Sequence, residues 1–189
     1  MQLCEKTTEQ TAAEPGAWER MVSEYVVCFV CTGNTCRSPM AAAILNDLAG
    51  RGEKLTVPNR TDGQEDLRVR AVSAGLFAQE GMPIADNAVA ALEKAGILST
   101  QSNPYREHKA RQIREDLVRK SDLIVGISES HAQMLRVAFP DQTDRICALP
   151  CDVPDPYGGD ADTYARCLDQ LVAAVRTMFV PVEGGESEC

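Results

Sequence analysis

Residues 30–41 of the chain read VCTGNTCRSPMA, and this stretch decides both the fold and the chemistry. It places two cysteines five positions apart, with Gly33 and Asn34 between them and Arg37 and Ser38 directly after the second. A metal clip, a disulfide and a catalytic loop would each use such a pattern. The flanking sequence has to separate these three alternatives.

The segments on either side of this stretch predict a strand and a helix. YVVCFV at 25–30 is an uninterrupted β-branched and aromatic run, as expected of a strand buried on both faces of a parallel sheet. SPMAAAILNDLAG at 38–50 predicts a helix in which Ser38 caps the start and Gly50 ends the last turn. Strand, tight loop and helix in this order are typical of an α/β protein.

Strands and helices continue to alternate along the rest of the chain. Further strands are predicted at 68–75, 121–127 and 145–150, and further helices at 85–96, 109–120, 128–139 and 161–179. This alternation implies a parallel sheet with helices on both faces. Ligands bind beyond the carboxyl ends of the strands in such sheets, and the loop that begins at Cys31 lies at that edge.

Composition and charge limit the possible functions. The chain has 189 residues, of which 44% are hydrophobic and 25% charged, as in a globular domain of ordinary size. No apolar run reaches the roughly 18 residues of a membrane helix and no secretory signal is visible, so we expect a cytoplasmic protein. The net charge of −9 argues against nucleic acid or an anionic membrane as the main partner.

Residues 24–180 are expected to form a single domain. Residues 1–23 are polar and lack apolar periodicity, which predicts a flexible N-terminal extension, and Met21 is a second candidate for the natural start. Residues 181–189 are predicted to be a flexible acidic tail.

The eight cysteines are interpreted as thiols, because no export signal accompanies them. Metal binding at Cys28, Cys31 and Cys36 is disfavoured, since Cys28 lies inside an apolar strand and no fourth ligand is evident. We expect neither a metal nor another cofactor. Reversible oxidation between Cys31 and Cys36 is a separate, regulatory alternative, because a reactive thiolate beside a second cysteine is the arrangement of redox-sensing sites.

Cys31 and Arg37 have the spacing of a loop that wraps a tetrahedral oxyanion. Successive backbone N–H groups and the N-terminus of the following helix would face the anion. Gly33 and Asn34 tolerate the unusual dihedral angles that a tight loop requires. Arg37 can grip two phosphate oxygens at once, and the same positive field favours the thiolate of Cys31.

A thiolate beneath a bound phosphoryl group predicts covalent transfer through a phosphocysteine. Ser38 is placed to hydrogen-bond that thiolate and to help it leave later. The leaving group needs an acid, and DPYGG at 155–159 supplies Asp155, which two prolines bracket. Tyr157 is expected to line the mouth of the site. A plain Asp-Pro turn and a packing role for Tyr157 are the alternatives for this segment.

With these motifs in place, the chain resembles the low-molecular-weight protein tyrosine phosphatase family. The resemblance rests on VCTGNTCRSPMA, VSAG, GMPIADNAVAALEKAGI, SDLIVGISESH and DPYGG, which follow one another in the family's order. It implies an α/β, three-layer flavodoxin-like fold with a four-stranded parallel sheet of order 2-1-3-4 and helices on both faces. It also implies that Cys31 is the nucleophile, Arg37 the phosphate clamp and Asp155 the general acid.

The resemblance further implies which groups meet in the site. The ligands are a phosphorylated protein substrate and, in the loop, phosphate or another tetrahedral oxyanion, and the functionally opposed partner is a protein kinase. The residues expected to bind substrate and phosphate are Thr32, Gly33, Asn34, Thr35, Cys36, Arg37, Ser38 and Tyr157.

Position 35 bears on the choice of substrate. Tyrosine-directed members of the family usually carry an aliphatic β-branched residue there, whereas Thr35 and the DPYGG pattern resemble the bacterial protein-arginine phosphatase branch. A threonine hydroxyl can orient a water or the guanidinium phosphate, and Asp155 can bind the N–H donors of phosphoarginine. We therefore favour phosphoarginine over phosphotyrosine, which makes the opposed kinase an arginine kinase.

Two functions from other classes remain open. Arsenate reductases of the same fold share the loop but need two further redox cysteines, for which only Cys147 and Cys151 are candidates. A phosphate-binding module without activity would not require a nucleophile, a clamp and an acid together. His108 and His131 are interpreted as surface or capping groups, because neither has an evident catalytic partner in the sequence.

Overall fold

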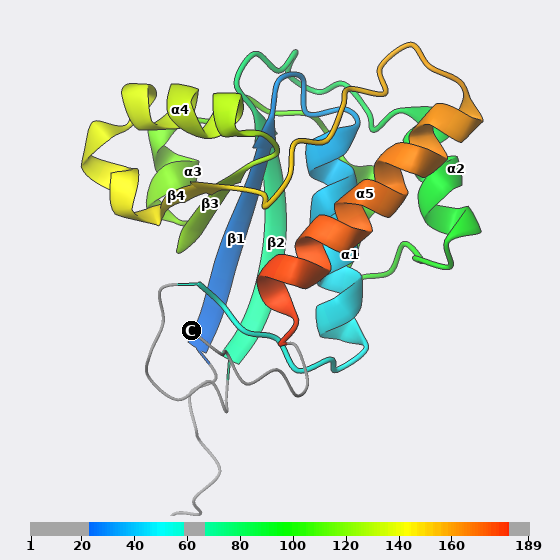
Figure 1. Cartoon of the computed structure of the whole chain (residues 1–189), viewed down its shortest axis with the longest axis horizontal. Helices are drawn as coiled ribbons and strands as arrows, with labels where there is room; N and C mark the ends of the chain where they lie inside the picture. The colour runs from blue at the N-terminus through cyan, green and yellow to red at the C-terminus, as the bar shows by residue number, and fades with distance from the viewer. Residues whose placement is uncertain (1–22, 59–66, 182–189) are drawn as a thin grey trace, which may run out of the picture.

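A parallel sheet centred on one strand organises the chain (Figure 1). The computed structural model describes residues 23–58 and 67–181. The strands are β1 (Ser23–Cys31), β2 (Leu67–Gly75), β3 (Leu123–Gly126) and β4 (Ile146–Ala148). The helices are α1 (Arg37–Gly50), α2 (Asp86–Lys94), α3 (Glu115–Arg119), α4 (Glu129–Ala138) and α5 (Ala161–Phe179), with 3-10 turns η1 (Tyr105–Glu107) and η2 (Pro140–Arg145).

The strand order is β2-β1-β3-β4 and every pair is parallel, which confirms the predicted order 2-1-3-4. β1 lies between β2 and β3, and its residues from Val26 to Cys31 are all buried. The uninterrupted apolar sequence of β1 follows from this central position, because helices cover both of its faces.

Alternate residues of β1 belong to two separate hydrophobic cores. Val27, Phe29 and Cys31 pack with side chains of α1, α2 and α5, whereas Cys28 and Val30 pack with side chains of α3 and α4. Figure 1 shows α1, α2 and α5 gathered on one side of the sheet and α3 and α4 on the other. The alternation confirms the three-layer architecture and puts Cys28 on the opposite face from Cys31. These two thiols therefore cannot share a metal ion.

The prediction of a helix over 109–120 is wrong for residues 109–114. Only α3 is helical, and the preceding residues are extended because their backbone bonds to the end of β2. Gly75 N donates to Arg111 O at 2.9 Å, and Ile113 N donates to Gly75 O at 2.9 Å. These bonds hold the segment beside the carboxyl edge of the sheet.

The start of α1 also differs from the prediction. Cys36 occupies the N-cap position, and Arg37 is the first helical residue. The predicted cap, Ser38, is buried within the first turn, where its hydroxyl takes part in the site described below. Gly50 ends the helix as predicted.

The described part of the chain contains no helix that is both long and apolar enough to cross a membrane. The predicted N-terminal extension and acidic tail lie outside the described residues, apart from Ser23, which opens β1, and Pro181 at the end of the described range.

Candidate active site

The loop between β1 and α1 is held against the end of β2, at the carboxyl edge of the sheet (Figure 1). Leu76 N donates to Cys31 O and Phe77 N donates to Thr32 O, both at 2.9 Å. A Cβ atom added to Gly75 would lie 2.7 Å from Thr32 O and 3.0 Å from Asn34 N. The glycine of the VSAG motif is therefore required by the close approach of the loop backbone.

Asn34 fixes the conformation of the loop. Its φ of 56° makes it the only non-glycine residue with a positive φ among those the structure describes, and its side chain is fully buried. Asn34 Nδ2 donates to Ser38 Oγ and Ser73 Oγ, both at 2.9 Å. Arg111 N donates to Asn34 Oδ1 at 2.9 Å, and His108 Nε2 donates to Asn34 O at 2.8 Å. These bonds stabilise a backbone geometry that most residues avoid.

The sulfur of Cys31 lies at the base of the loop, where the side chain is only 3% exposed. Asn34 N donates to this sulfur at 3.3 Å, and Ser38 Oγ lies 3.0 Å from it. Ser38 Oγ also lies 3.1 Å from Ala74 O and accepts a bond from the Asn34 amide. The single hydroxyl proton of Ser38 therefore goes either to the sulfur or to the carbonyl, and a thiolate would attract it to the sulfur.

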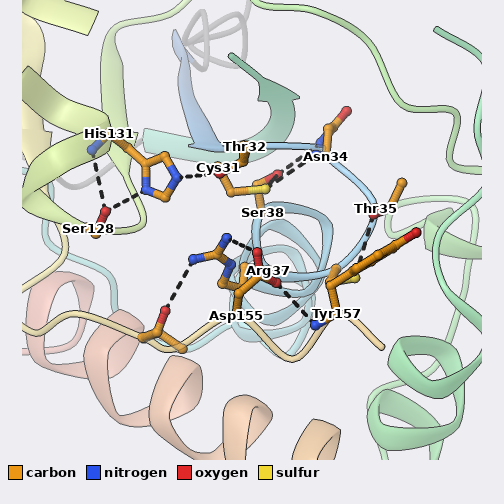
Figure 2. Close-up of polar contacts among 12 residues, drawn as sticks. Cys31, Thr32, Asn34, Thr35, Arg37, Ser38, Ser128, His131, Asp155 and Tyr157 are labelled. Carbon is orange, nitrogen blue, oxygen red and sulfur yellow. Dashed lines mark hydrogen bonds and ion pairs between the residues drawn. The ribbon is translucent and has the colours of Figure 1, made fainter. Parts of the chain in front are cut away.

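Arg37 connects the loop to the segment that follows β4. Its Nη2 lies 2.5 Å from Asp155 Oδ2, and its Nη1 donates to Val153 O at 3.3 Å (Figure 2). The guanidinium is buried, but Arg37 Nε has no hydrogen-bond partner within the described residues. A buried unpaired donor is costly, and an oxyanion seated in the loop would satisfy it. The predicted oxyanion thus fits the residues that are present.

The DPYGG segment lies between β4 and α5 and contacts Arg37 through Asp155. The Asp155 carboxylate is 48% exposed and also accepts a bond from Tyr157 N at 3.2 Å. This segment therefore contains both an Asp-Pro turn and a contact with the loop at 31–37, which is called the anion loop below. The Tyr157 side chain is 78% exposed, which contradicts a packing role and is consistent with a place at the rim.

Thr35 and Cys36 complete the loop on the side of α5. Thr35 is half-buried, its carbonyl accepts a bond from Ala85 N at 2.9 Å, and its hydroxyl lies 3.5 Å from Cys36 Sγ. Cys36 is buried, with its sulfur 3.2 Å from Tyr164 Oη. The structure thus brings all of the predicted loop residues together around Cys31 and Arg37.

Cys28, Cys147 and Cys167 are poor candidates for redox chemistry with the loop, whereas Cys151 is exposed. Burial raises the pKa of the Cys28 and Cys167 thiols to about 12 and that of Cys147 to about 11, so all three are protonated at neutral pH. All six cysteines within 23–58 and 67–181 are free thiols. No cluster of three or more His, Cys, Asp or Glu side chains suited to a metal ion occurs in these ranges.

The interpretation of the histidines as surface groups is wrong for His131, and both histidines also contact the loop, which the sequence did not indicate. His108 donates to the carbonyl of Asn34, as described above. His131 is only 6% exposed, and its Nε2 lies 3.0 Å from Thr32 Oγ1 (Figure 2). Burial lowers the pKa of both imidazoles, and Arg37 adds to the effect on His131. The available signal was position, because His131 ends a motif just beyond the carboxyl end of β3.

Comparisons with known proteins agree with this geometry. A family model described as low molecular weight phosphotyrosine protein phosphatase matches residues 26–186. A protein-arginine-phosphatase of Bacillus subtilis is 33% identical over 160 residues, covering 80% of this chain and 93% of the relative. A low molecular weight protein-tyrosine-phosphatase of Streptomyces coelicolor is 31% identical over 173 residues, covering 84% and 93% of the two chains.

A solved structure with the same fold bears on the chemistry. It is a mutant of the YwlE arginine phosphatase with a phosphorylated active site serine. It superposes on this chain with a TM-score of 0.65 at 30% identity, covering 80% of this chain and 91% of the other.

Proposed function

The chain belongs to the low molecular weight phosphotyrosine protein phosphatase family. We propose that it is a metal-independent protein-arginine phosphatase that acts through a phosphocysteine on Cys31. The observation that carries the proposal is the set of hydrogen-bonding groups around the Cys31 sulfur. Ser38 and the Asn34 backbone N–H stabilise a thiolate, while the unpaired Arg37 Nε matches an oxyanion above it.

In the first step, the Cys31 thiolate attacks phosphorus while Arg37 and the loop N–H groups hold the three equatorial oxygens. An S–P bond forms and the bond from phosphorus to the arginine nitrogen breaks. Asp155 donates its proton to that nitrogen, so the arginine side chain leaves phosphorus with its guanidinium intact. Without this proton the side chain would have to leave as the strongly basic neutral guanidine.

In the second step, water attacks the phosphocysteine. The Asp155 carboxylate left by the first step accepts a proton from this water, an O–P bond forms and the S–P bond breaks. Ser38 donates its hydroxyl proton toward the departing sulfur, which returns as the thiolate. Inorganic phosphate leaves, and Cys31 and Asp155 are restored.

Two features favour phosphoarginine over the alternative substrate, phosphotyrosine. The Thr35 hydroxyl stands on the loop where tyrosine-directed relatives usually carry an aliphatic side chain, and a hydroxyl can accept a guanidinium N–H. The protein-arginine-phosphatase of Bacillus subtilis aligns over most of the chain. We place residues 24–180 in one catalytic domain, working in the cytoplasm on phosphorylated proteins opposite an arginine kinase.

The thiol-coupled arsenate reductase alternative receives less support. Its downstream pair would be Cys147 and Cys151, and burial keeps Cys147 protonated by raising its pKa to about 11. Reversible oxidation of Cys31 with Cys36 stays a prediction, compatible with two free thiols on one loop.

The deciding experiment compares the purified protein on phosphoarginine and phosphotyrosine peptides of the same sequence context. We expect the higher kcat/KM on phosphoarginine, and the Thr35→Ile variant to move the ratio toward phosphotyrosine. Cys31→Ser should reduce turnover to background while inorganic phosphate still binds. Retained turnover by Cys31→Ser would exclude the phosphocysteine, and an unchanged ratio in Thr35→Ile would exclude the role given to Thr35.

A further inference from the structure

A chain of polar contacts runs from α4 to the anion loop and is not used by the mechanism above. His131 Nδ1 lies 2.6 Å from Ser128 Oγ, and His131 Nε2 lies 3.0 Å from Thr32 Oγ1 (Figure 2). His131 and Ser128 are buried, whereas Thr32 is exposed next to Cys31 in the loop. The buried imidazole therefore fixes an exposed hydroxyl beside the nucleophile.

The backbone positions this imidazole firmly. Ser128 is the N-cap of α4, and its Oγ accepts a bond from His131 N at 3.4 Å. A Cβ atom at Gly126 would lie 2.6 Å from Ala132 N, so the glycine lets the first turn of α4 approach the end of β3. The first turn of this helix is thus held close to the carboxyl edge of the sheet, where the loop lies.

The imidazole carries a defined hydrogen-bond polarity when it is neutral. Burial, and secondly the nearby Arg37, lowers the pKa of His131, while Asp155 and Asp152 oppose the effect. A neutral ring has one donor and one acceptor nitrogen. If Nδ1–H donates to Ser128 Oγ, then Nε2 accepts the hydroxyl proton of Thr32. The Ser128 hydroxyl can then donate its own hydrogen bond to Ser130 Oγ, which lies 2.8 Å away.

In this arrangement the lone pairs of Thr32 Oγ1 remain free to accept a bond from a substrate. Figure 2 shows His131 on one side of Cys31 and Thr35 and Tyr157 on the other, with Thr32 directly beside Cys31. Both threonine hydroxyls belong to the loop that carries the nucleophile, Thr32 next to Cys31 and Thr35 three positions further on. A guanidinium offers N–H donors along both of its edges, whereas the phenyl ring of phosphotyrosine offers none.

We propose that His131 is a positioning residue that turns Thr32 into a hydrogen-bond acceptor for the guanidinium of phosphoarginine, so that the Ser128–His131–Thr32 chain contributes to substrate specificity. This inference rests on the proposed function, because it assigns a second contact to the same substrate. It predicts that loss of the Thr32 hydroxyl lowers kcat/KM on phosphoarginine more than kcat/KM on phosphotyrosine.

The test measures kcat/KM on phosphoarginine and phosphotyrosine peptides for Thr32→Val, Thr32→Ser and His131→Phe. Thr32→Val and His131→Phe should each lower the ratio of the phosphoarginine value to the phosphotyrosine value about tenfold, as expected for one lost hydrogen bond. Thr32→Ser should keep the wild-type ratio because it retains the hydroxyl. Thr177→Val is the matched control, since Thr177 is exposed on α5 and bonds only to Ala173 O.

The results separate this inference from the proposed function. If Thr32→Val lowers both values equally, Thr32 acts on the phosphoryl group or on the loop conformation, and the inference is overturned. An unchanged ratio overturns it too. Thermal unfolding identifies a misfolded His131→Phe, in which case the exposed Thr32 variants decide. A wild-type protein that fails to hydrolyse phosphoarginine overturns the proposed substrate and this contact together.

Discussion

The two sides of the site are held in different ways. On the nucleophile side, Cys31, Asn34 and Ser38 are buried and joined by hydrogen bonds that close on one another and on β2. On the acid side, Asp155 and Tyr157 are exposed, and the Asp155 side chain contacts Arg37 and the backbone N–H of Tyr157. The first side is formed before substrate arrives, whereas the second depends on a contact that substrate can replace.

Arg37 belongs to both sides, which explains why they differ. Its Nη2 is bonded to Asp155 and its Nε is unpaired. A phosphoryl group in the loop would take both nitrogens in a bidentate contact, as guanidinium groups do with phosphate. The carboxyl group of Asp155 would then be released toward the leaving group. The attacking sulfur of Cys31 is therefore held rigidly, whereas the acid, Asp155, is held by an ion pair that substrate can replace.

Replacing the acid should have the largest effect on activity. Asp155→Asn keeps the size of the side chain but cannot donate a carboxyl proton, so kcat on phosphoarginine or phosphotyrosine peptides should fall about 10²–10⁴-fold. The fall should be much smaller with p-nitrophenyl phosphate, whose leaving group needs little protonation. Asp152→Asn is the matched control, because Asp152 bonds to Glu129 N outside the loop. Equal losses on good and poor leaving groups would contradict the assignment of Asp155.

Disturbing the preformed side without touching a reacting group should have the next largest effect. Gly75→Ala forces the loop backbone away from β2, and a displacement of about 1 Å at the nucleophile costs on the order of 100-fold in kcat. Gly50→Ala is a suitable control, since a Cβ atom there would meet only Ser102 Oγ at 3.9 Å. Wild-type kcat in a folded Gly75→Ala protein would show that the loop tolerates the shift.

The difference in rigidity should also appear in stability. Asn34→Ala removes three side-chain hydrogen bonds and leaves alanine at a positive φ, so we expect a loss of about 2–3 kcal/mol in the free energy of unfolding. Tyr157→Ala on the exposed side should change it by less than about 0.5 kcal/mol. Urea unfolding of the two variants measures the contrast, and similar values would mean that both sides are equally rigid.

The sequence was sufficient for the strand, loop and helix around Cys31 because local patterns encode them, whereas the sheet order came from the family resemblance. A buried run, a glycine-containing turn and an alanine-rich helix follow one another within 25–50. The contacts that position the loop are not local. His108 and Asn34 are 74 residues apart, and His131 and Thr32 are 99 apart, so only the packed structure brings them together.

The helix predicted over 109–120 failed for a related reason. The segment has helical composition, but its backbone donors and acceptors bond to Gly75 and Met82 instead. Tertiary hydrogen bonds therefore override propensity where the chain supports the anion loop. The unpaired Arg37 Nε could not be foreseen either, because it depends on which partners the folded chain leaves for each nitrogen.

The smallest expected effect is a pH dependence of stability that comes from both supporting histidines. Burial lowers the pKa of His108 and His131 below the usual 6.5 of the unfolded chain. As pH falls through 6.5, the histidines of the unfolded state bind protons before those of the folded state do. Their contribution to the free energy of unfolding is therefore fully present above pH 6.5 and declines below it. We expect Tm to drop by about 2–4 °C across this range.

These are the only two histidines of the chain, so the effect can be isolated. A His108→Gln, His131→Gln double variant should show a flatter Tm profile between pH 7.5 and 5.5 than the wild type. His108 supports Asn34 on the preformed side and His131 holds Thr32, so the two single variants separate the contributions. An equally steep profile in the double variant would assign the pH dependence to carboxylates instead.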